Sequence, residues 1–250
     1  MVTGGGRGIG AAVARSLGGA GAAVVVASRT RGQVEQVAGE LREAGSVVWP
    51  LSVDVTDPGS VRELARGATE RLGRVDILVN NAGVAHSAPL HRLTLEDWNR
   101  LFAVNATGTF LCTQGFLPGM LERGWGRIVN VASVSGVTGA KYIAAYAASK
   151  HAVVGFTRCI AAEVAAAGVT VNAVCPGYVN SSMTDESLER ISGKTGLSRD
   201  QALQALLETT PQRRLIEPEE VAHVALSLCA EDARGINGQT IVMDGGRLLA

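Results

Sequence analysis

The sequence is poor in the residues that build metal sites and disulfide frameworks. It has four cysteines and four histidines in 250 residues, and none of them falls in a metal-ligand spacing such as Cys-x-x-Cys. We therefore predict no metal site, and we expect the cysteines to be free thiols in a reducing cytoplasm. Aromatic residues are also scarce, at 4% of a chain that is 46% hydrophobic. This composition is typical of buried Val- and Ile-rich strands covered by Ala-rich helices.

Net charge and long hydrophobic runs are absent as well. The 23 basic residues balance 23 acidic residues, which leaves no electrostatic argument for binding nucleic acid or an anionic membrane. The apolar run from Leu17 to Ala27 is too short to span a bilayer. Arg7 and Arg15 interrupt any signal-peptide pattern. The sequence thus predicts a soluble, cytoplasmic protein with neither a nucleic-acid nor a membrane partner.

Strand-like and helix-like segments alternate along the chain, with no repeat or linker between them. Short Val-rich runs predict strands at 24–27, 47–53, 75–79, 126–132, 169–175 and 239–243. Helices are predicted at 31–44, 57–72, 94–123 and 146–167, and another near Pro218. Asp57, Pro58 and a capping-box-like pair, Thr94 and Asp97, mark two helix starts. This order predicts an α/β fold, a single Rossmann-like domain over residues 1–250 with a seven-stranded parallel doubly wound sheet and helices on both faces.

A glycine-rich turn opens the chain and leads into an Ala-rich, helix-like stretch. It reads Thr3-Gly4-Gly5-Gly6-Arg7-Gly8-Ile9-Gly10. Glycines at such a turn allow the backbone to approach a pyrophosphate and to direct the N–H groups of a helix N-terminus at it. The spacing is G-x-x-x-G-x-G rather than the G-x-G-x-x-G fingerprint. A turn in this position, before a helix and a second strand, favours a dinucleotide phosphate site.

Tyr146 and Lys150 are four residues apart in Tyr146-Ala-Ala-Ser-Lys150, and Ser133 precedes them. Residues i and i+4 share one face of a helix, so the Lys150 ammonium is expected to lie beside the phenol. An unperturbed tyrosine has a pKa of about 10, and a neighbouring positive charge favours the phenolate. The spacing therefore predicts that Lys150 lowers the pKa of Tyr146 into the range of a proton-transfer catalyst.

Together these residues resemble the short-chain dehydrogenase/reductase family over nearly the whole chain. The family's turn is matched by Thr3, Gly4, Gly8 and Gly10, its N-N-A-G segment by Asn80-Asn81-Ala82-Gly83, and its Pro-Gly step by Pro176-Gly177. Its active-site Asn, Ser, Tyr and Lys match Asn105, Ser133, Tyr146 and Lys150, in order and spacing. One departure is the first strand, because only Met1 and Val2 precede Thr3. The strand is either shortened, or the sequence given begins within it.

The resemblance implies a hydride transfer between a nicotinamide and a carbonyl carbon. Tyr146 would exchange the proton of the alcohol oxygen, and Ser133 would hydrogen-bond that oxygen. Lys150 would bind the nicotinamide ribose, and Asn105 would hold a water that links Lys150 to solvent. Ser135 and Tyr142 do not fit the family spacing.

The cofactor phosphate is predicted from the end of the second strand. NAD-selective members carry an Asp or Glu there, whereas this chain has Ser28 and Arg29, with Arg7 in the turn. Guanidinium groups suit a 2′-phosphate by charge and geometry, so NADP(H) is expected and NAD(H) is the alternative. The predicted cofactor-binding residues are Gly4, Arg7, Gly8, Ile9, Gly10, Ser28, Arg29, Asp54, Val55, Asn81, Ala82, Gly83, Tyr146, Lys150, Pro176, Gly177, Val179 and Ser181.

The stretch 180–214 is expected to be a variable substrate lid, with helical pieces at 184–192 and 198–209 around a hinge at 193–196. His86 is a candidate for substrate contact, but its loop position favours exposure to solvent. His151 is expected to face away from the site.

Several runs resemble 3-oxoacyl-thioester reductases and polyketide ketoreductases, among them 120–130 and 172–176. The predicted activity is reduction of a ketone or 3-oxoacyl group by NADP(H). One alternative is an NAD-linked secondary-alcohol or 3-hydroxyacyl dehydrogenase, and another is a non-enzymatic nucleotide-sensing scaffold. The resemblance also implies a homotetramer or homodimer.

Overall fold

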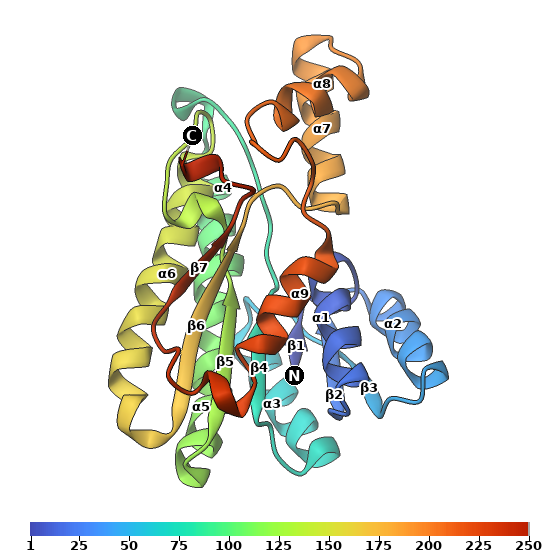
Figure 1. Cartoon of the computed structure of the whole chain (residues 1–250), viewed down its shortest axis with the longest axis vertical. Helices are drawn as coiled ribbons and strands as arrows, with labels where there is room; N and C mark the ends of the chain where they lie inside the picture. The colour runs from blue at the N-terminus through green and yellow to red at the C-terminus, as the bar shows by residue number, and fades with distance from the viewer. Residues whose placement is uncertain (250) are drawn as a thin grey trace.

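The computed structural model describes residues 1–249, which form one parallel sheet with helices on both faces (Figure 1). The sheet order is β3-β2-β1-β4-β5-β6-β7, and every neighbouring pair is parallel. The seven strands are β1 (Val2–Thr3), β2 (Val24–Ser28), β3 (Val48–Ser52), β4 (Ile77–Asn80), β5 (Gly126–Val131), β6 (Val169–Pro176) and β7 (Thr240–Met243). The predicted seven-stranded doubly wound sheet is confirmed.

The helices occupy the connections between the strands. They are α1 (Gly8–Gly19), α2 (Arg31–Glu43), α3 (Pro58–Leu72), α4 (Leu95–Phe102), α5 (Gly108–Arg123), α6 (Ala144–Val164), α7 (Ser182–Thr195), α8 (Arg199–Leu207) and α9 (Pro218–Ser227). Two hydrophobic clusters show how they are layered. Side chains of α1, α2 and α9 pack on one face of the sheet, and side chains of α3, α5 and α6 pack on the other.

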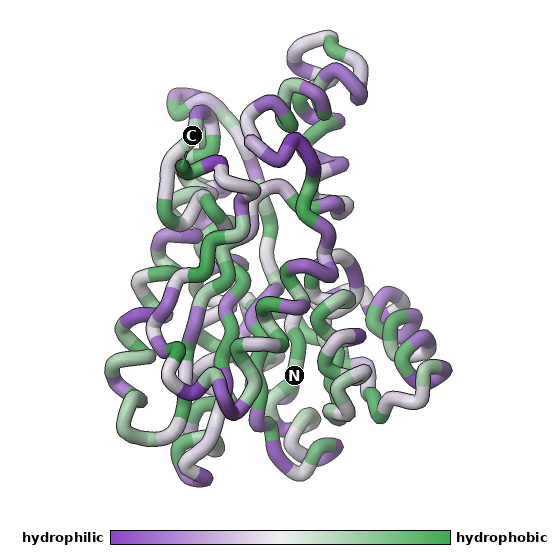
Figure 2. The backbone as a smooth tube through the Cα atoms, viewed as in Figure 1, coloured by the Kyte–Doolittle hydropathy of each residue, from purple (hydrophilic) through white to green (hydrophobic). Residues whose placement is uncertain are grey.

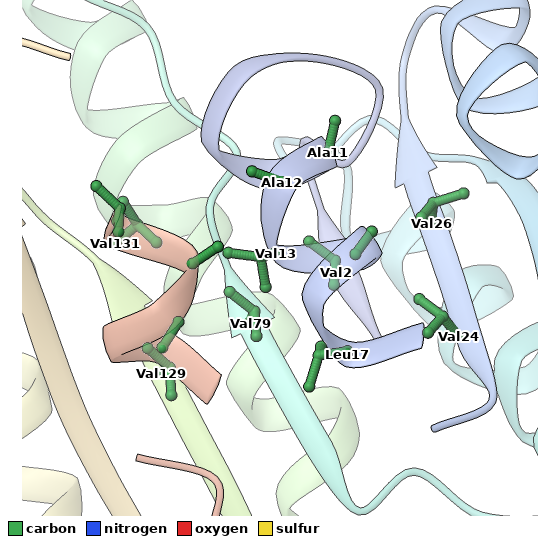
Figure 3. Close-up of a cluster of buried hydrophobic side chains, with 14 of the residues drawn as sticks. Val2, Ala11, Ala12, Val13, Leu17, Val24, Val26, Val79, Val129 and Val131 are labelled. Atoms are coloured by element: carbon green, nitrogen blue, oxygen red, sulfur yellow. The ribbon is translucent and has the colours of Figure 1, made fainter. Parts of the chain in front are cut away.

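Valine and alanine dominate the cluster beneath α1 (Figure 3). Val13 and Leu17 of α1 lie over Val2, Val24, Val26 and Val79 of the central strands. Small and β-branched side chains let the helix approach the sheet closely, and β-branched residues suit the pleated surface. Hydrophobic residues accordingly run along the central strands (Figure 2).

The sequence located two helix starts correctly, with one difference in detail. Asp57 caps α3 by accepting hydrogen bonds from the main-chain N–H groups of Gly59 and Ser60. Thr94 caps α4 by accepting from the N–H of Asp97 at 3.0 Å. The expected capping box at Thr94 is incomplete, because the Asp97 carboxylate accepts from the Thr94 hydroxyl and not from its main-chain N–H.

The predicted long helix at 94–123 is interrupted. A π-helical turn at Ala103–Thr107 separates α4 from α5 and contains Asn105. A π turn lodges one extra residue in a helix and is common at functional sites, and hydrophobic periodicity gives no signal for it.

The segment predicted to be a lid forms α7 and α8, which project beyond the sheet in Figure 1 and share a small core of their own around Leu188, Ala202 and Leu206. The predicted hinge at 193–196 is wrong for its first three residues, which belong to α7. Only Gly196, with φ +75°, ends the helix. Among residues 1–249, no helix has the length and apolar character needed to cross a membrane.

Candidate active site

Close packing explains the glycines of the opening turn. A Cβ added to Gly10 would lie 2.2 Å from the carbonyl oxygen of Gly4, and one added to Gly4 would lie 2.9 Å from Cα of Ala82. Gly4 also has φ +62°, which side chains disfavour. The turn after β1 and the segment after β4 therefore touch backbone to backbone.

A set of hydrogen bonds holds these two segments together. The Thr3 hydroxyl accepts from the N–H groups of Asn81 (3.0 Å) and Ala82 (3.2 Å). In return, the Asn81 side-chain amide donates to the carbonyl oxygens of Thr3 and Gly4, both at 3.1 Å. We refer to these contacts as the Thr3–Asn81 clamp. It lies where the strand order reverses between β1 and β4, the usual ligand site of such sheets.

A cavity of about 370 Å³ opens beside the clamp. Gly8 and Ile9, the first residues of α1, line it, and α1 has no side-chain cap on its N–H groups. The N-terminus of a helix carries a partial positive charge. Because its N–H groups are uncapped and the preceding turn is rich in glycine, this end of α1 can bind a pyrophosphate. The predicted cofactor residues that line this cavity are Gly4, Arg7, Gly8, Ile9, Ser28, Arg29, Asp54, Val55, Asn81, Ala82, Gly83 and Ser181.

A second cavity of about 340 Å³ adjoins the first, and the two share Ile9, Asn81, Gly83, Val84, Ser181 and Met183 in their linings. The predicted residues found there are Ser133, Tyr146, Lys150, Pro176, Gly177 and Val179. Of all the predicted site residues, only Gly10 and Asn105 line neither cavity. Gly10 serves the packing of the turn instead.

Tyr146 and Ser133 are brought together at the wall of the second cavity. Ser133 is close enough to the Tyr146 phenol to lower its pKa as a hydrogen-bonding partner, and the Ser133 oxygen is fixed by the N–H of Ser135 at 3.1 Å. Burial raises the pKa of Tyr146 above its ordinary value, and the bond to Ser133 opposes this only in part. The expectation that Lys150 lowers this pKa is wrong for the protein without cofactor. Desolvation is the largest cause of the raised pKa, and the Lys150 nitrogen lies 6.0 Å from the centroid of the Tyr146 ring.

Lys150 is buried, with 5% of its surface exposed. Its Nζ donates to the carbonyl oxygen of Val131 at 2.9 Å. Burial disfavours the charged form and lowers the pKa of Lys150 from 10.5 to about 8. The amine therefore changes its charge close to physiological pH.

The side chain of Asn105 is engaged by the protein on every donor. Its Nδ2 donates to the carbonyl oxygen of Val84 and to the Ser149 hydroxyl, both at 3.0 Å, while Oδ1 accepts from the N–H of Val84 at 2.9 Å. Asn105 thus anchors the loop after β4 beside the active site. A water on this side chain, as the predicted relay requires, would have to bind at Oδ1, because both amide hydrogens are used.

Ser149 was not predicted as a site residue, yet it joins two that were. Its hydroxyl accepts from Asn105 and donates to the main-chain carbonyl of Tyr146 at 2.7 Å, and its side chain is fully buried. The signal was available in the sequence, because Ser149 lies three residues after Tyr146 on a helix.

Two cations lie near the adenosine end of the first cavity. Arg29 is exposed and takes part in none of the ion pairs formed by residues 1–249, whereas Arg7 contacts Glu186 of α7 at 3.5 Å. Asp54 accepts from the N–H and hydroxyl of Thr56, and these bonds, with the charge of Arg29, lower its pKa. Sequence reasoning missed Gly6, Thr30, Gln33, Val53, Val84, Val104, Ser182 and Met183 in this lining.

His86 and His151 lie in different surroundings. His86 lines the second cavity and lies 3.6 Å from Asp97, so it is not simply exposed. His151 bonds its own helix through the carbonyl oxygen of Ala147 and lines neither cavity, as predicted. Tyr142 and Ser135 also line the second cavity. Within the part of the chain that the structure describes, no group of His, Cys, Asp and Glu residues is arranged to hold a metal ion.

The fold and the site together define an oxidoreductase with a nucleotide-binding sheet and a Ser-Tyr-Lys centre. A family model described as short chain dehydrogenase matches residues 1–192. The chain therefore belongs to the short chain dehydrogenase family.

The proteins that this chain resembles are named as dehydrogenases and reductases. The D-beta-hydroxybutyrate dehydrogenase of Rhizobium meliloti (strain 1021) is 36% identical over 98% of this chain and 96% of its own length. The acetoacetyl-CoA reductase of the same organism is 38% identical over 100% and 98%. A crystal structure of a variant actinorhodin polyketide ketoreductase with NADPH has a TM-score of 0.96 and 39% identity, covering 98% of this chain and 95% of that one.

The pKa of Lys150 predicts how stability depends on pH. Between pH 8 and 10.5 the unfolded chain carries a proton on Lys150 that the folded chain has lost, so this group makes the free energy of unfolding rise with pH. The full rise is on the order of 3 kcal/mol. We expect Lys150→Met to abolish it, so that wild type gains stability relative to the variant as pH increases from about 7 to 9.5. Urea unfolding of the cofactor-free proteins measures this difference, and the exposed Lys141→Met is the control. Parallel curves for wild type and Lys150→Met would contradict the prediction.

Ser149→Ala should destabilise the chain, because it leaves a buried Asn105 N–H without an acceptor. The expected loss is about 1–3 kcal/mol in the free energy of unfolding. Ser227→Ala is a matched control, since Ser227 makes the same kind of intrahelical bond, to His223 at 2.9 Å, at an exposed position. Equal losses of unfolding free energy in the two variants would show that the Ser149 bridge between Asn105 and Tyr146 stabilises the chain no more than an ordinary intrahelical hydrogen bond does.

Proposed function

We propose that the chain is an NADP(H)-dependent oxidoreductase that interconverts a ketone and a secondary alcohol. The observation that carries the proposal is the meeting of Ser133, Tyr146 and Lys150 on the wall of a cavity that continues into the nucleotide cavity. The names of the relatives, a hydroxybutyrate dehydrogenase and an acetoacetyl-CoA reductase, support this substrate class. A 3-oxoacyl thioester is the finer candidate. The predicted homotetramer and the cytoplasmic location stay predictions.

The residues around the first cavity suit a dinucleotide. The Gly4–Gly10 turn and the uncapped start of α1 would hold its pyrophosphate, and Asp54, Val55 and Asn81 its adenosine part. Arg29 and Arg7 supply the positive charge that a 2′-phosphate requires, and α2 adds its N-terminus, which has no side-chain cap and no acidic residue in its first turn. Pro176, Gly177, Val179 and Ser181 would face the nicotinamide. When bound, this cofactor supplies or accepts a hydride.

The protein's own part of the reaction is proton transfer and charge stabilisation. Because burial raises the pKa of Tyr146, its phenol is protonated at neutral pH and is ready to donate to the oxygen of a ketone. Ser133 Oγ lies beside the same hydroxyl and would share the hydrogen bond to the developing alkoxide. The protonated phenol favours reduction. In the reverse direction Tyr146 must accept a proton, and the nearby Lys150 would ease this when charged.

Tyr146→Phe tests the proton donor. We expect kcat for ketone reduction to fall by about 10²- to 10⁴-fold, because the phenol is the general acid. The measurement is the loss of nicotinamide absorbance with a panel of ketones and acyl thioesters. Tyr142→Phe removes another hydroxyl from the same cavity and should lower kcat far less. Undiminished turnover by Tyr146→Phe would favour another mechanism, and binding of nucleotide without any turnover by wild type would favour a nucleotide-sensing scaffold.

Arg29→Gln tests the cofactor. Removal of one charged hydrogen-bond donor to the 2′-phosphate should weaken NADPH binding about tenfold or more and leave NADH binding almost unchanged. Fluorescence titration with both nucleotides gives the two dissociation constants. Arg15→Gln is the control, since Arg15 pairs with Glu40 at 2.6 Å and lines neither cavity. Equal weakening of NADPH and NADH, or tighter binding of NADH by wild type, would favour the NAD-linked alternative.

A further inference from the structure

The charged side chains that line the second cavity are all basic. Its lining contains Lys141, Arg190 and Arg247 in addition to the catalytic Lys150, and it contains no aspartate or glutamate. The chain as a whole has equal numbers of basic and acidic residues, so composition does not explain the excess. A cavity with unbalanced cationic walls favours a ligand of negative charge.

A turn stabilised by hydrogen bonds holds Arg247 at the second cavity. Both oxygens of the buried Asp244 accept main-chain hydrogen bonds, from Gly246 and Leu248 at 2.9 Å each. Gly245 has φ +64°, and a Cβ there would lie 2.7 Å from Thr210. The nearest carboxylate in sequence is thus used to shape the turn.

Arg247 lines the same cavity as Tyr146. Its guanidinium lies 5.3 Å from the ring centroid of Tyr178, which also lines the second cavity. Tyr178 is in turn close enough to Tyr146 to affect its pKa. An anion beside Arg247 would therefore be near a carbonyl group at Tyr146.

Arg190 approaches the same cavity from the lid helix α7. Its only side-chain hydrogen bond is to the carbonyl oxygen of Glu186, at 3.4 Å on its own helix. Two acidic residues of this helix have other partners, because Asp185 pairs with Arg199 and Glu186 with Arg7. Neither Arg190 nor Arg247 takes part in the ion pairs of residues 1–249. Both arginines that line the second cavity are therefore without an ion-pair partner among residues 1–249.

We propose that the substrate carries an oxyanion group close to its carbonyl, and that Arg190 and Arg247 recognise this group and so determine specificity. This inference rests on the proposed ketone reduction. A guanidinium offers a planar fork of N–H donors that matches a carboxylate or a phosphate. The cavity, at about 340 Å³, is at the lower end of the range of about 300 to 1,000 Å³ for ligand pockets. Because Arg190 and Arg247 line the same cavity as Tyr146, the anion and the reacting carbonyl would belong to one small ligand, as in a short oxo acid.

The test uses two pairs of substrates that differ in charge. Acetoacetate is compared with methyl acetoacetate, and acetoacetyl-CoA with the acetoacetyl thioester of N-acetylcysteamine. The first pair probes a carboxylate and the second probes the phosphates of a thioester carrier. Two quantities are measured for each compound: kcat/KM with NADPH, and the dissociation constant from quenching of the fluorescence of bound NADPH, which does not require turnover.

The variants are Arg247→Gln and Arg190→Gln, with Arg234→Gln as the control. Arg234 is exposed and lines neither cavity. We expect wild type to prefer acetoacetate to its methyl ester, and each cavity variant to lower kcat/KM for acetoacetate by about 10- to 100-fold. Activity with the neutral member should stay within about twofold, which shows that folding and cofactor binding are intact.

The outcomes separate this inference from the proposed function. Reduction of neutral and charged ketones at equal efficiency, or a preference for charge that survives in both variants, would overturn the inference and leave the reductase proposal in place. Preference for acetoacetate over its methyl ester identifies an oxo acid, whereas a preference confined to the thioester pair would place the anion far from the carbonyl and overturn the inference. Absence of binding and turnover with all four compounds would overturn both the inference and the proposed 3-oxo substrate class.

Discussion

The Thr3–Asn81 clamp is the constraint on which the site depends. It joins the end of β1 to the end of β4, two segments 78 residues apart in sequence, through hydrogen bonds to main-chain groups on both sides. The contact is so close that Gly4 and Gly10 leave no room for side chains. With the two segments fixed, α1 begins at the cavity, and the loop after Gly83 passes between the two cavities. The chemistry then needs only residues added at the ends of β5 and β6 and on α6.

Local features of the site were predictable because local spacing determines them. Tyr146 and Lys150 share a helix face because they are four residues apart. Glycines in a turn before a helix are typical of a phosphate-binding site. The sequence did not predict contacts between distant segments. Arg7 meets Glu186 across 179 residues, and the Asn105 side chain is occupied by Val84 and Ser149. Whether an expected donor is free to hold water depends on such contacts, and spacing carries no information about them.

The sign of a pKa shift is another property that spacing cannot give. The i,i+4 pair supplies attraction between an ammonium and a phenolate, but burial penalises both charges. Desolvation is the larger effect for each group here, so the pKa of Tyr146 is raised and that of Lys150 is lowered. The cofactor-free centre therefore favours a neutral phenol beside an amine that is easily deprotonated. That state suits proton donation to a ketone better than proton removal from an alcohol.

Positive charge lies along the whole cleft formed by the two cavities. Arg7 and Arg29 lie at the nucleotide end, the start of α1 lies at the middle, and Arg190 and Arg247 lie at the opposite end. Helix α7 spans this distance, since Glu186 contacts Arg7 while Arg190, one turn later, lines the second cavity. Unpaired cations reduce stability when they are partly removed from water, and residues 1–249 pair most of their other arginines. Arg29 at one end and Arg190 and Arg247 at the other are without ion-pair partners among residues 1–249, so each end of the cleft offers donors that suit an anionic group.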